Sequence, residues 1–281
     1  MTIFKHKIFL VTCFFLLSTA LFGDNRNVIK FAPLPTKKAS KNIEDFLPMN
    51  SYLKEKLSID IDYVYKKDYQ DILNGFKDGS IDMAYLGPLP YVALKKEYMF
   101  VRPIISFKQK SGLSKYRCVL AKFKNDKFDK KSQIKVALTQ PLSTCGYFMT
   151  NKLLKENFDI ELKNQKYDYT MSHTNALISV VKGEYLISGA KYSIAKKYES
   201  LGVEIIAQSK LIPGFSLVVN TQTLSQKQIN EIQKTLLQIS NEKLKSIKGI
   251  MKYGVEKANI SDYNELVIDF HIPKRGNIKW R

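Results

Sequence analysis

Two hydroxyl side chains, Ser143 and Thr144, stand side by side where the sequence predicts the beginning of a helix. A β-rich run at 134–139 precedes them, and a helix-compatible run at 147–154 follows. Hydroxyls and unpaired backbone N–H groups are therefore expected to meet at a helix N-terminus, the positive end of the helix dipole. Such an arrangement binds anions. The alternative is an ordinary Ser/Thr helix cap with no ligand.

Two further segments place small or polar residues at the end of a predicted strand. The first, 82–91, ends its strand at Gly87 and Pro88, where a ligand can approach the backbone closely, and its tyrosines supply hydroxyl donors. The second, 172–177, puts His173 in the first turn of a helix, where the dipole favours the neutral imidazole. A structural turn and a lone surface histidine are the alternatives.

The cysteines leave two possibilities open. Cys118 and Cys145 both follow the N-terminal segment. In an exported chain they are able to form a disulfide, although no spacing rule demands it. Cys145 as a catalytic nucleophile would need a base, and only His173 and His271 are available after that segment.

Alternating short strands and helices must position these residues. Strands are predicted at 28–32, 59–65, 81–86, 116–122, 134–139 and 203–207, and helices at 40–57, 69–78, from 146 onward, and at 224–239. This alternation favours an α/β architecture with mostly parallel sheets. No low-complexity linker separates the halves, so we expect two lobes joined by crossing strands, with 211–214 as the return crossing. The cleft at the crossing is the expected place of Gly87 and Ser143.

The N-terminus and the charge suggest where the protein works. Residues 1–23 have the layout of a signal peptide, with an apolar block too short for a comfortable membrane span, which predicts an exported, periplasmic protein. A lipid anchor at Cys13 and an uncleaved N-terminal anchor are the alternatives. Lys and Arg number 45 against 26 Asp and Glu, giving a net charge of +19. The lysines are scattered, so a basic surface or an anionic ligand is expected and nucleic acid is not.

Taken in order, these segments resemble the phosphonate-binding proteins of bacterial ABC uptake systems, within the phosphate, phosphite and phosphonate periplasmic receptors. The segments that carry the resemblance span nearly the whole chain after residue 23: 28–35, 67–72, 82–91, 143–147, 173–177 and 211–214.

The resemblance implies a class II periplasmic binding fold, in which two α/β lobes with mixed, mostly parallel sheets close on a ligand. Lobe 1 would comprise 24–112 and 214–281, and lobe 2 would comprise 113–213. The implied ligand-binding residues are Tyr69, Tyr85, Gly87, Pro88, Ser143, Thr144, Cys145, His173 and Phe215. The implied partners are a small anion and an inner-membrane ABC permease, with no cofactor, no metal and a monomeric protein.

Two departures from the family pattern bear on the ligand. Cys145 replaces the third serine of the family's Ser-Thr-Ser segment and is a weaker donor. Phe215 stands where members that bind aminoalkylphosphonates have an acid just after Pro-Gly. Because an ammonium group buried without a carboxylate is unfavourable, we expect poor binding of 2-aminoethylphosphonate.

The expected function is therefore capture of phosphate, phosphite or a small non-amino phosphonate for an ABC importer, without enzymatic activity. One alternative keeps the fold but makes the chain a ligand-sensing subunit for a signalling partner. The other is a periplasmic thiol hydrolase that uses Cys145 and His173.

Overall fold

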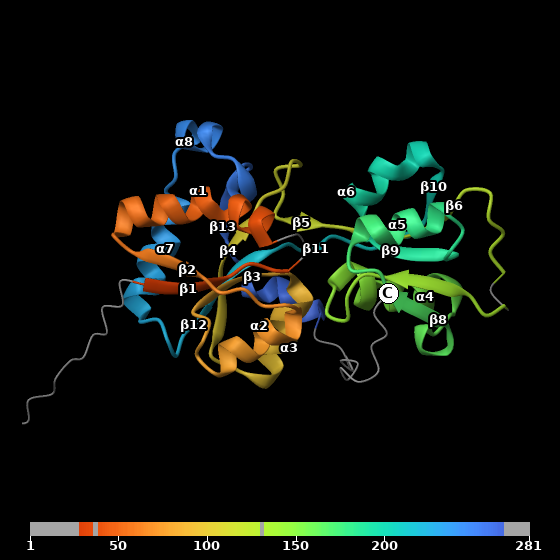
Figure 1. Ribbon diagram of the computed structural model, residues 1–281, viewed down its shortest axis with the longest axis horizontal. Helices are drawn as coiled ribbons and strands as arrows, with labels where there is room; N and C mark the ends of the chain where they lie inside the picture. The colour runs from red at the N-terminus through yellow and green to blue at the C-terminus, as the bar shows by residue number, and fades with distance from the viewer. Residues whose placement is uncertain (1–27, 36–38, 130–131, 267–281) are drawn as a thin grey trace, which may run out of the picture.

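The computed structural model describes residues 28–35, 39–129 and 132–266. The predicted signal peptide at 1–23, including Cys13, lies outside these residues, as does His271. The described chain forms two lobes, each built on one sheet, with short strands running between them (Figure 1).

The first sheet has six strands in the order β13-β4-β12-β3-β1-β2. Its strands are β1 (Val28–Ala32), β2 (Asp60–Tyr63), β3 (Met83–Leu86), β4 (Val101–Phe107), β12 (Ser216–Asn220) and β13 (Val255–Lys257). The chain therefore leaves this lobe after β4 and returns to its centre at β12. Neighbouring residues of β12 face opposite cores, because Leu217 and Val219 belong to one apolar cluster and Val218 to another.

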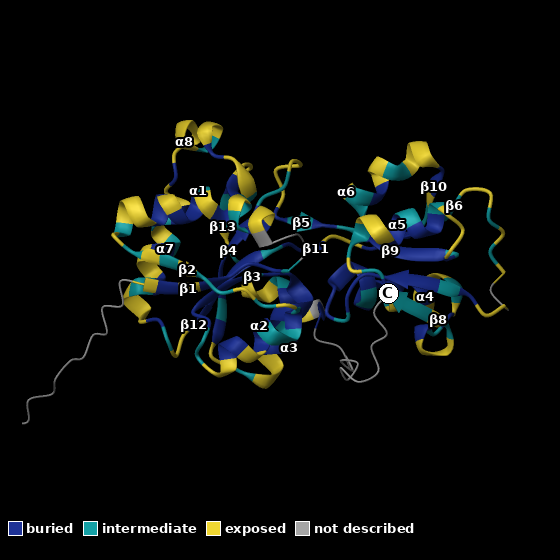
Figure 2. Ribbon diagram, in the orientation of Figure 1, coloured by how far each residue is buried: buried dark blue, intermediate teal, exposed yellow. Residues whose placement is uncertain are grey.

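Helices cover both faces of the first sheet. Its helices are α1 (Ala39–Leu57), α2 (Tyr69–Lys77), α3 (Pro88–Glu97), α7 (Gln226–Leu237) and α8 (Asn241–Ser246). Helices α1 and α7 pack together in the cluster that contains Leu53 and Ile232, whereas α2 and α3 supply Phe76 and Leu89 to the cluster on the other face. Figure 2 shows the strands buried between helices whose outer sides are exposed.

The second sheet has five strands in the order β10-β6-β9-β7-β8. Its strands are β6 (Cys118–Phe123), β7 (Lys135–Leu138), β8 (Lys166–Tyr169), β9 (Ile187–Lys191) and β10 (Val203–Gln208). Its helices are α4 (Met149–Phe158), α5 (His173–Val181) and the short α6 (Tyr192–Ala195), with 3-10 turns at Leu162–Asn164 and Lys196–Leu201. Two further 3-10 turns, Gly249–Met251 and Ile260–Leu266, belong to the C-terminal part of the chain.

The α/β fold with mixed sheets is as predicted, but the parallel share is smaller than "mostly parallel" implies. Parallel pairing joins β1 to β2 and β3, and β7 to β8 and β9. The other described pairs are antiparallel, including both partners of β12 and of β6. The difference arises because a strand that returns from the other lobe enters the sheet in the opposite direction.

Several elements of the first lobe were not predicted, among them β12, β13 and α8, and two others, α3 and β4, contain a proline. In α3, Gly87 is the N-cap and Pro88 the first helical residue, so a sequence that looks like a turn begins a helix. Strand β4 contains Pro103, which usually argues against a strand. The register between β4 and β12 shifts between Leu217 and Val218, opposite this proline, and such an irregularity accommodates a missing N–H.

Two short strands cross between the lobes. Strand β5 (Lys115–Tyr116) carries the chain toward the second lobe, and β11 (Ile212–Pro213) brings it back, paired antiparallel to β5. Gly214 follows β11, and a Cβ there would lie 1.9 Å from the Ser114 carbonyl oxygen. Only glycine therefore allows the strands to approach this closely.

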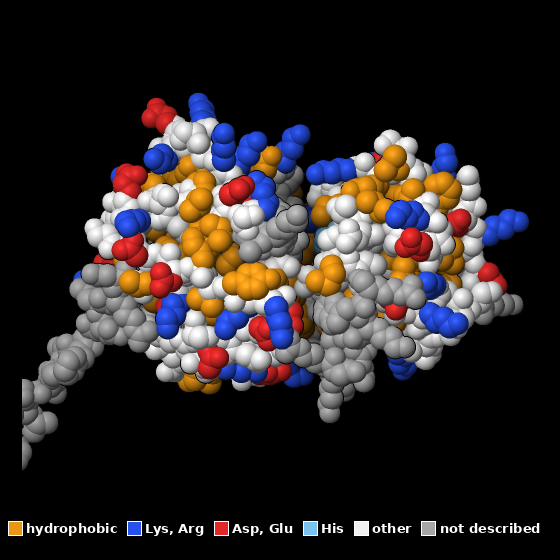
Figure 3. All heavy atoms as spheres, viewed as in Figure 1, with side chains coloured by type: hydrophobic (Ala, Val, Ile, Leu, Met, Phe, Trp, Pro, Cys, Tyr) orange, Lys and Arg blue, Asp and Glu red, His pale blue; other side chains and the backbone are white. Residues whose placement is uncertain are grey.

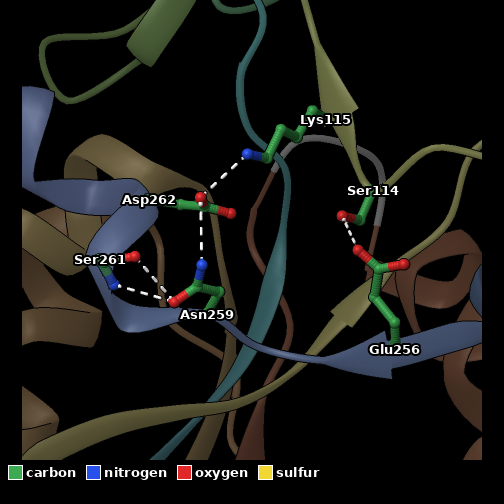
Figure 4. Close-up of polar contacts among 6 residues, drawn as sticks. All are labelled: Ser114, Lys115, Glu256, Asn259, Ser261 and Asp262. Atoms are coloured by element: carbon green, nitrogen blue, oxygen red, sulfur yellow. Dashed lines mark hydrogen bonds and ion pairs between the residues drawn. The ribbon is translucent and has the colours of Figure 1, made fainter.

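The C-terminal segment ties down the outgoing strand (Figure 4). Lys115 Nζ lies 2.9 Å from a carboxylate oxygen of Asp262, and the Ser114 hydroxyl donates to Glu256. Asn259 donates to Asp262 and accepts from Ser261, which fixes the turn that presents the acid. We propose that the lobes divide at these crossings, near residues 112 and 214.

Among the described helices, none is long and apolar enough to cross a membrane.

Candidate functional site

The segment around Ser143 and Thr144 forms a capped helix start, as predicted. Ser143 is the N-cap, and its hydroxyl accepts from the Gly146 N–H at 3.1 Å. One turn of π-helix, Thr144–Phe148, follows and runs directly into α4. A Cβ on Gly146 would lie 1.9 Å from the Thr139 hydroxyl, so glycine lets the cap lie against the end of β7.

Cys145 is covalently bound within this cap. It forms a disulfide with Cys118, the first residue of β6, with Cα atoms 5.1 Å apart. The bond fastens the helix start to the second sheet. It also removes the thiolate that a nucleophilic cysteine requires, so this arrangement does not support the thiol-hydrolase alternative.

A cavity of about 440 Å³ lies at this helix start, between the two lobes. Eight of the nine predicted ligand-binding residues line it: Tyr69, Tyr85, Gly87, Ser143, Thr144, Cys145, His173 and Phe215. Pro88 is not among its lining residues; it is buried in the first turn of α3, and Pro90 lines the cavity instead. The groove between the lobes is visible on the surface in Figure 3.

Thr144 connects the two lobes at the cavity. Its Oγ1 accepts a hydrogen bond from the backbone N–H of Leu89 in α3, at 3.1 Å. It also bonds to the hydroxyl of Tyr116, on the crossing strand β5. The first lobe, the crossing strand and the helix start at Ser143 therefore converge on one hydroxyl.

Three tyrosines form the polar wall of the cavity. Burial raises the pKa of Tyr69, Tyr85 and Tyr116 far above the ordinary value. Each stays protonated over the physiological range and remains a hydroxyl donor. Tyr116 was not among the predicted site residues.

His173 occupies the first turn of α5, after the N-cap Ser172. Burial and the neighbouring Lys191 lower the pKa of His173 to about 4, although a hydrogen bond to the Gly189 backbone opposes this. The imidazole is thus neutral at pH 7. Its Nδ1 is buried and has no hydrogen-bond partner among the described residues. The hydroxyl of Thr139, which also lines the cavity, is likewise buried without a partner among them.

Phe215 belongs to an aromatic wall. Its ring stacks on Tyr85, with centroids 4.8 Å apart and planes 10° from parallel, and lies 6.2 Å from the Tyr116 ring. At position 215 the cavity is therefore lined by an aromatic ring and not by a carboxylate. Asp45 of α1 does line the cavity, however, and was not predicted; it already interacts with another group.

Lys191 is the main residue that the sequence did not reveal. It is the last residue of β9 and lines the cavity. Its ammonium lies 4.8 Å from the centroid of the Tyr116 ring and 5.9 Å from that of Phe215. Burial lowers the pKa of Lys191 to about 8, so it is mostly charged at pH 7. The strand that ends at Lys191 was not predicted, so the sequence offered no signal for its place at the cavity.

These features suit an anion better than a metal. Hydroxyls, a helix start and a lysine ammonium converge on the cavity. Within the described part of the chain, no group of three or more His, Cys, Asp and Glu side chains is placed to hold a metal ion.

The family model for the phosphonate periplasmic substrate-binding protein of ABC transporters matches residues 31–263, which include the cap, the histidine and both crossings. The chain belongs to this family. Its members are solute-binding transport proteins of the periplasm rather than enzymes, and they work with a permease and a small ligand.

Solved structures show the same fold at low sequence identity. PhnD1 from Prochlorococcus marinus, in complex with methylphosphonate, has a TM-score of 0.69 and 15% identity, covering 86% of this chain and 96% of its own. A binding component of an ABC phosphonate transporter from Pseudomonas aeruginosa has a TM-score of 0.67 and 16% identity, and the match covers 85% of this chain and 84% of its own. XAC2383 from Xanthomonas citri, bound to ATP, has a TM-score of 0.71 and 15% identity, and the match covers 85% of this chain and 95% of its own.

Proposed function

We propose that this protein captures a small phosphorus oxyanion between its lobes and delivers it to the permease of an ABC importer. Phosphate, phosphite and small non-amino phosphonates are the ligands we expect. The observation that carries the proposal is the convergence of Ser143, Thr144 and Lys191 on one interlobe cavity. The methylphosphonate bound by a protein of the same fold supports the ligand class.

The oxyanion is expected to lie over the helix start. Backbone N–H groups and hydroxyls can solvate its oxygens, and Lys191 balances its charge. The bond between Leu89 and Thr144 joins the lobes next to the ligand. We propose that export by the signal at 1–23 brings the protein to the periplasm, where it acts as a monomer.

A calorimetric panel tests the ligand class. We expect phosphate, phosphite or methylphosphonate to bind, and sulfate to bind more weakly than the best of them. Binding to none of the three phosphorus oxyanions would refute the proposal.

A matched pair of cap variants tests the place of binding. Ser143 and Ser225 are both N-cap serines whose hydroxyls accept from a backbone N–H, but Ser225 begins α7 and does not line the cavity. Each Ser→Ala change should destabilise the protein by about 1 kcal/mol. Only Ser143→Ala should also raise the Kd, by about tenfold or more. Equal ligand affinity in both variants would place the ligand elsewhere.

The substituent is tested with 2-aminoethylphosphonate. We expect it to bind more weakly than methylphosphonate, because Phe215 offers no carboxylate and Lys191 repels an ammonium group. Asp45→Asn should leave this order unchanged. The opposite order, abolished by Asp45→Asn, would show that Asp45 holds the amine and that the non-amino assignment is wrong.

A further inference from the structure

A second hollow, of about 280 Å³, adjoins the interlobe cavity. The two share Tyr85, Lys191, Phe215 and Ile250 in their linings. Lys191 and the aromatic rings beside it therefore stand at the boundary between the cavity and the hollow. A ligand whose head lies over the cap has space for its substituent to extend past Lys191.

The second hollow is positively charged. Lys108, Lys110 and Lys191 line it, and no aspartate or glutamate does. Lys108 is paired with Glu256 at 3.7 Å. Neither Lys110 nor Lys191 forms an ion pair with a described residue, so two cations face the hollow without a carboxylate. Lys110 is exposed, whereas Lys191 is mostly covered by its neighbours.

The position of Lys191 is costly without an anion. Its ammonium lies against the Tyr116 and Phe215 rings, which exclude water but provide only weak cation–π attraction. A desolvated cation is stabilised most by a negative group brought close to it. Because Lys191 faces both spaces, that group can belong to the ligand's substituent as well as to its head.

We propose that Lys191, with Lys110 and Lys108 beyond it, forms a second anion subsite, and that the preferred ligand is a phosphonate whose short substituent ends in a carboxylate or another acid group. The proposal rests on the proposed function and specifies its substrate class. Such a ligand places one negative group at Ser143 and Thr144 and the other at the boundary of the hollow.

The proposal is tested by calorimetry with phosphonoacetate and its neutral isostere, phosphonoacetamide. The two ligands share size and head group and differ in the charge of the tail. The native protein should bind phosphonoacetate at least tenfold more tightly. Lys191→Met should reduce this preference to less than threefold, and Lys110→Met should reduce it in part.

Lys227→Met is the matched control, since Lys227 is exposed on α7 and lines neither space. It should leave the preference unchanged. Thermal melts establish that each variant is folded, and Lys110→Met, at an exposed site, keeps the test valid if Lys191→Met does not fold.

The outcomes separate this proposal from the one on which it rests. Equal binding of the two ligands by the native protein, or a preference that survives both lysine changes, overturns the second subsite while methylphosphonate still binds. Failure of phosphate, phosphite, methylphosphonate and phosphonoacetate alike to bind overturns the proposed function and the subsite together.

Discussion

His173 shows how one buried residue couples the site to pH. The bond to Gly189 engages one imidazole nitrogen as a donor, which leaves the unpartnered Nδ1 as an acceptor in the neutral ring. A protonated imidazole would place a positive charge beside Lys191 in a poorly hydrated position. The fold therefore favours neutral His173.

This preference predicts a loss of stability in acid. The pKa of His173 is about 4 in the folded protein and about 6.5 in the unfolded chain, so the unfolded chain binds more protons between these values. Stability should fall as the pH decreases from about 6.5 through 4. Denaturant titrations of the native protein and of His173→Asn measure it: the native protein should lose more stability over this interval. Parallel curves would contradict the assignment.

Residues differ in how far the sequence reveals their role. Ser143 was predictable because a cap depends on its immediate neighbours. Lys191 was not, because it is one of many scattered lysines, and its burial depends on Tyr116 and Phe215, which lie far away in the chain. Asp45 was missed because its place at the cavity likewise depends on residues that lie far away in the chain.

At the scale of elements, the disulfide holds the helix start to the second sheet. Cys118 and Cys145 are 27 residues apart, and a bond across such a loop stabilises a fold by about 3–4 kcal/mol through the entropy of the unfolded chain. It also limits how far the cap can move away from β6.

Removing both cysteines should therefore weaken stability and binding together. A Cys118→Ser, Cys145→Ser variant is expected to unfold at lower denaturant, with a loss of about 3 kcal/mol, and to bind methylphosphonate less tightly. Chemical denaturation and calorimetry measure the two effects. Reductant should destabilise the native protein but not the variant, and an effect on the variant would point to another cause.

The crossing strands give a second prediction at this scale. Gly214→Ala would force a Cβ against the Ser114 carbonyl oxygen, so β5 and β11 must separate. We expect a destabilisation of about 1–3 kcal/mol, measured by denaturant unfolding. A variant as stable as the native protein would show that β5 and β11 can separate without any loss of stability.

Many elements followed from local patterns, and two of the exceptions have clear physical reasons. Strand β1 has the predicted bounds and α2 nearly so, because periodicity and Gly79 mark them. Helix α3 and strand β4 were missed because Gly-Pro and Pro103 suggest turns. The start of a helix tolerates Pro88, and the register shift against β12 tolerates Pro103, so neither residue breaks its element.

At the scale of the whole molecule, the charge surrounds a cleft that is itself lined by a cation. The chain carries +19 in total, and lysines and arginines are spread over the visible face of both lobes in Figure 3. This field raises the concentration of small anions near the protein and speeds their encounter.

The association rate should therefore fall as salt is added. Between about 0.02 and 0.5 M sodium chloride, we expect the rate for methylphosphonate to drop several-fold, with a smaller change in the dissociation rate, because screening acts mainly on the approach. Stopped-flow tyrosine fluorescence measures both rates. An association rate that does not depend on salt would show that the positive charge of the protein does not speed ligand capture.

The covalent ring closed by Cys118 and Cys145 also affects how the protein survives damage. Strands β6 and β7 and the beginning of the cap lie within it. A protease that cuts the backbone once between these cysteines separates no fragment, because the disulfide still joins the two pieces. A nicked molecule would run as one band on a gel without reductant and as two bands with it, so a single band without reductant does not show that the chain is intact.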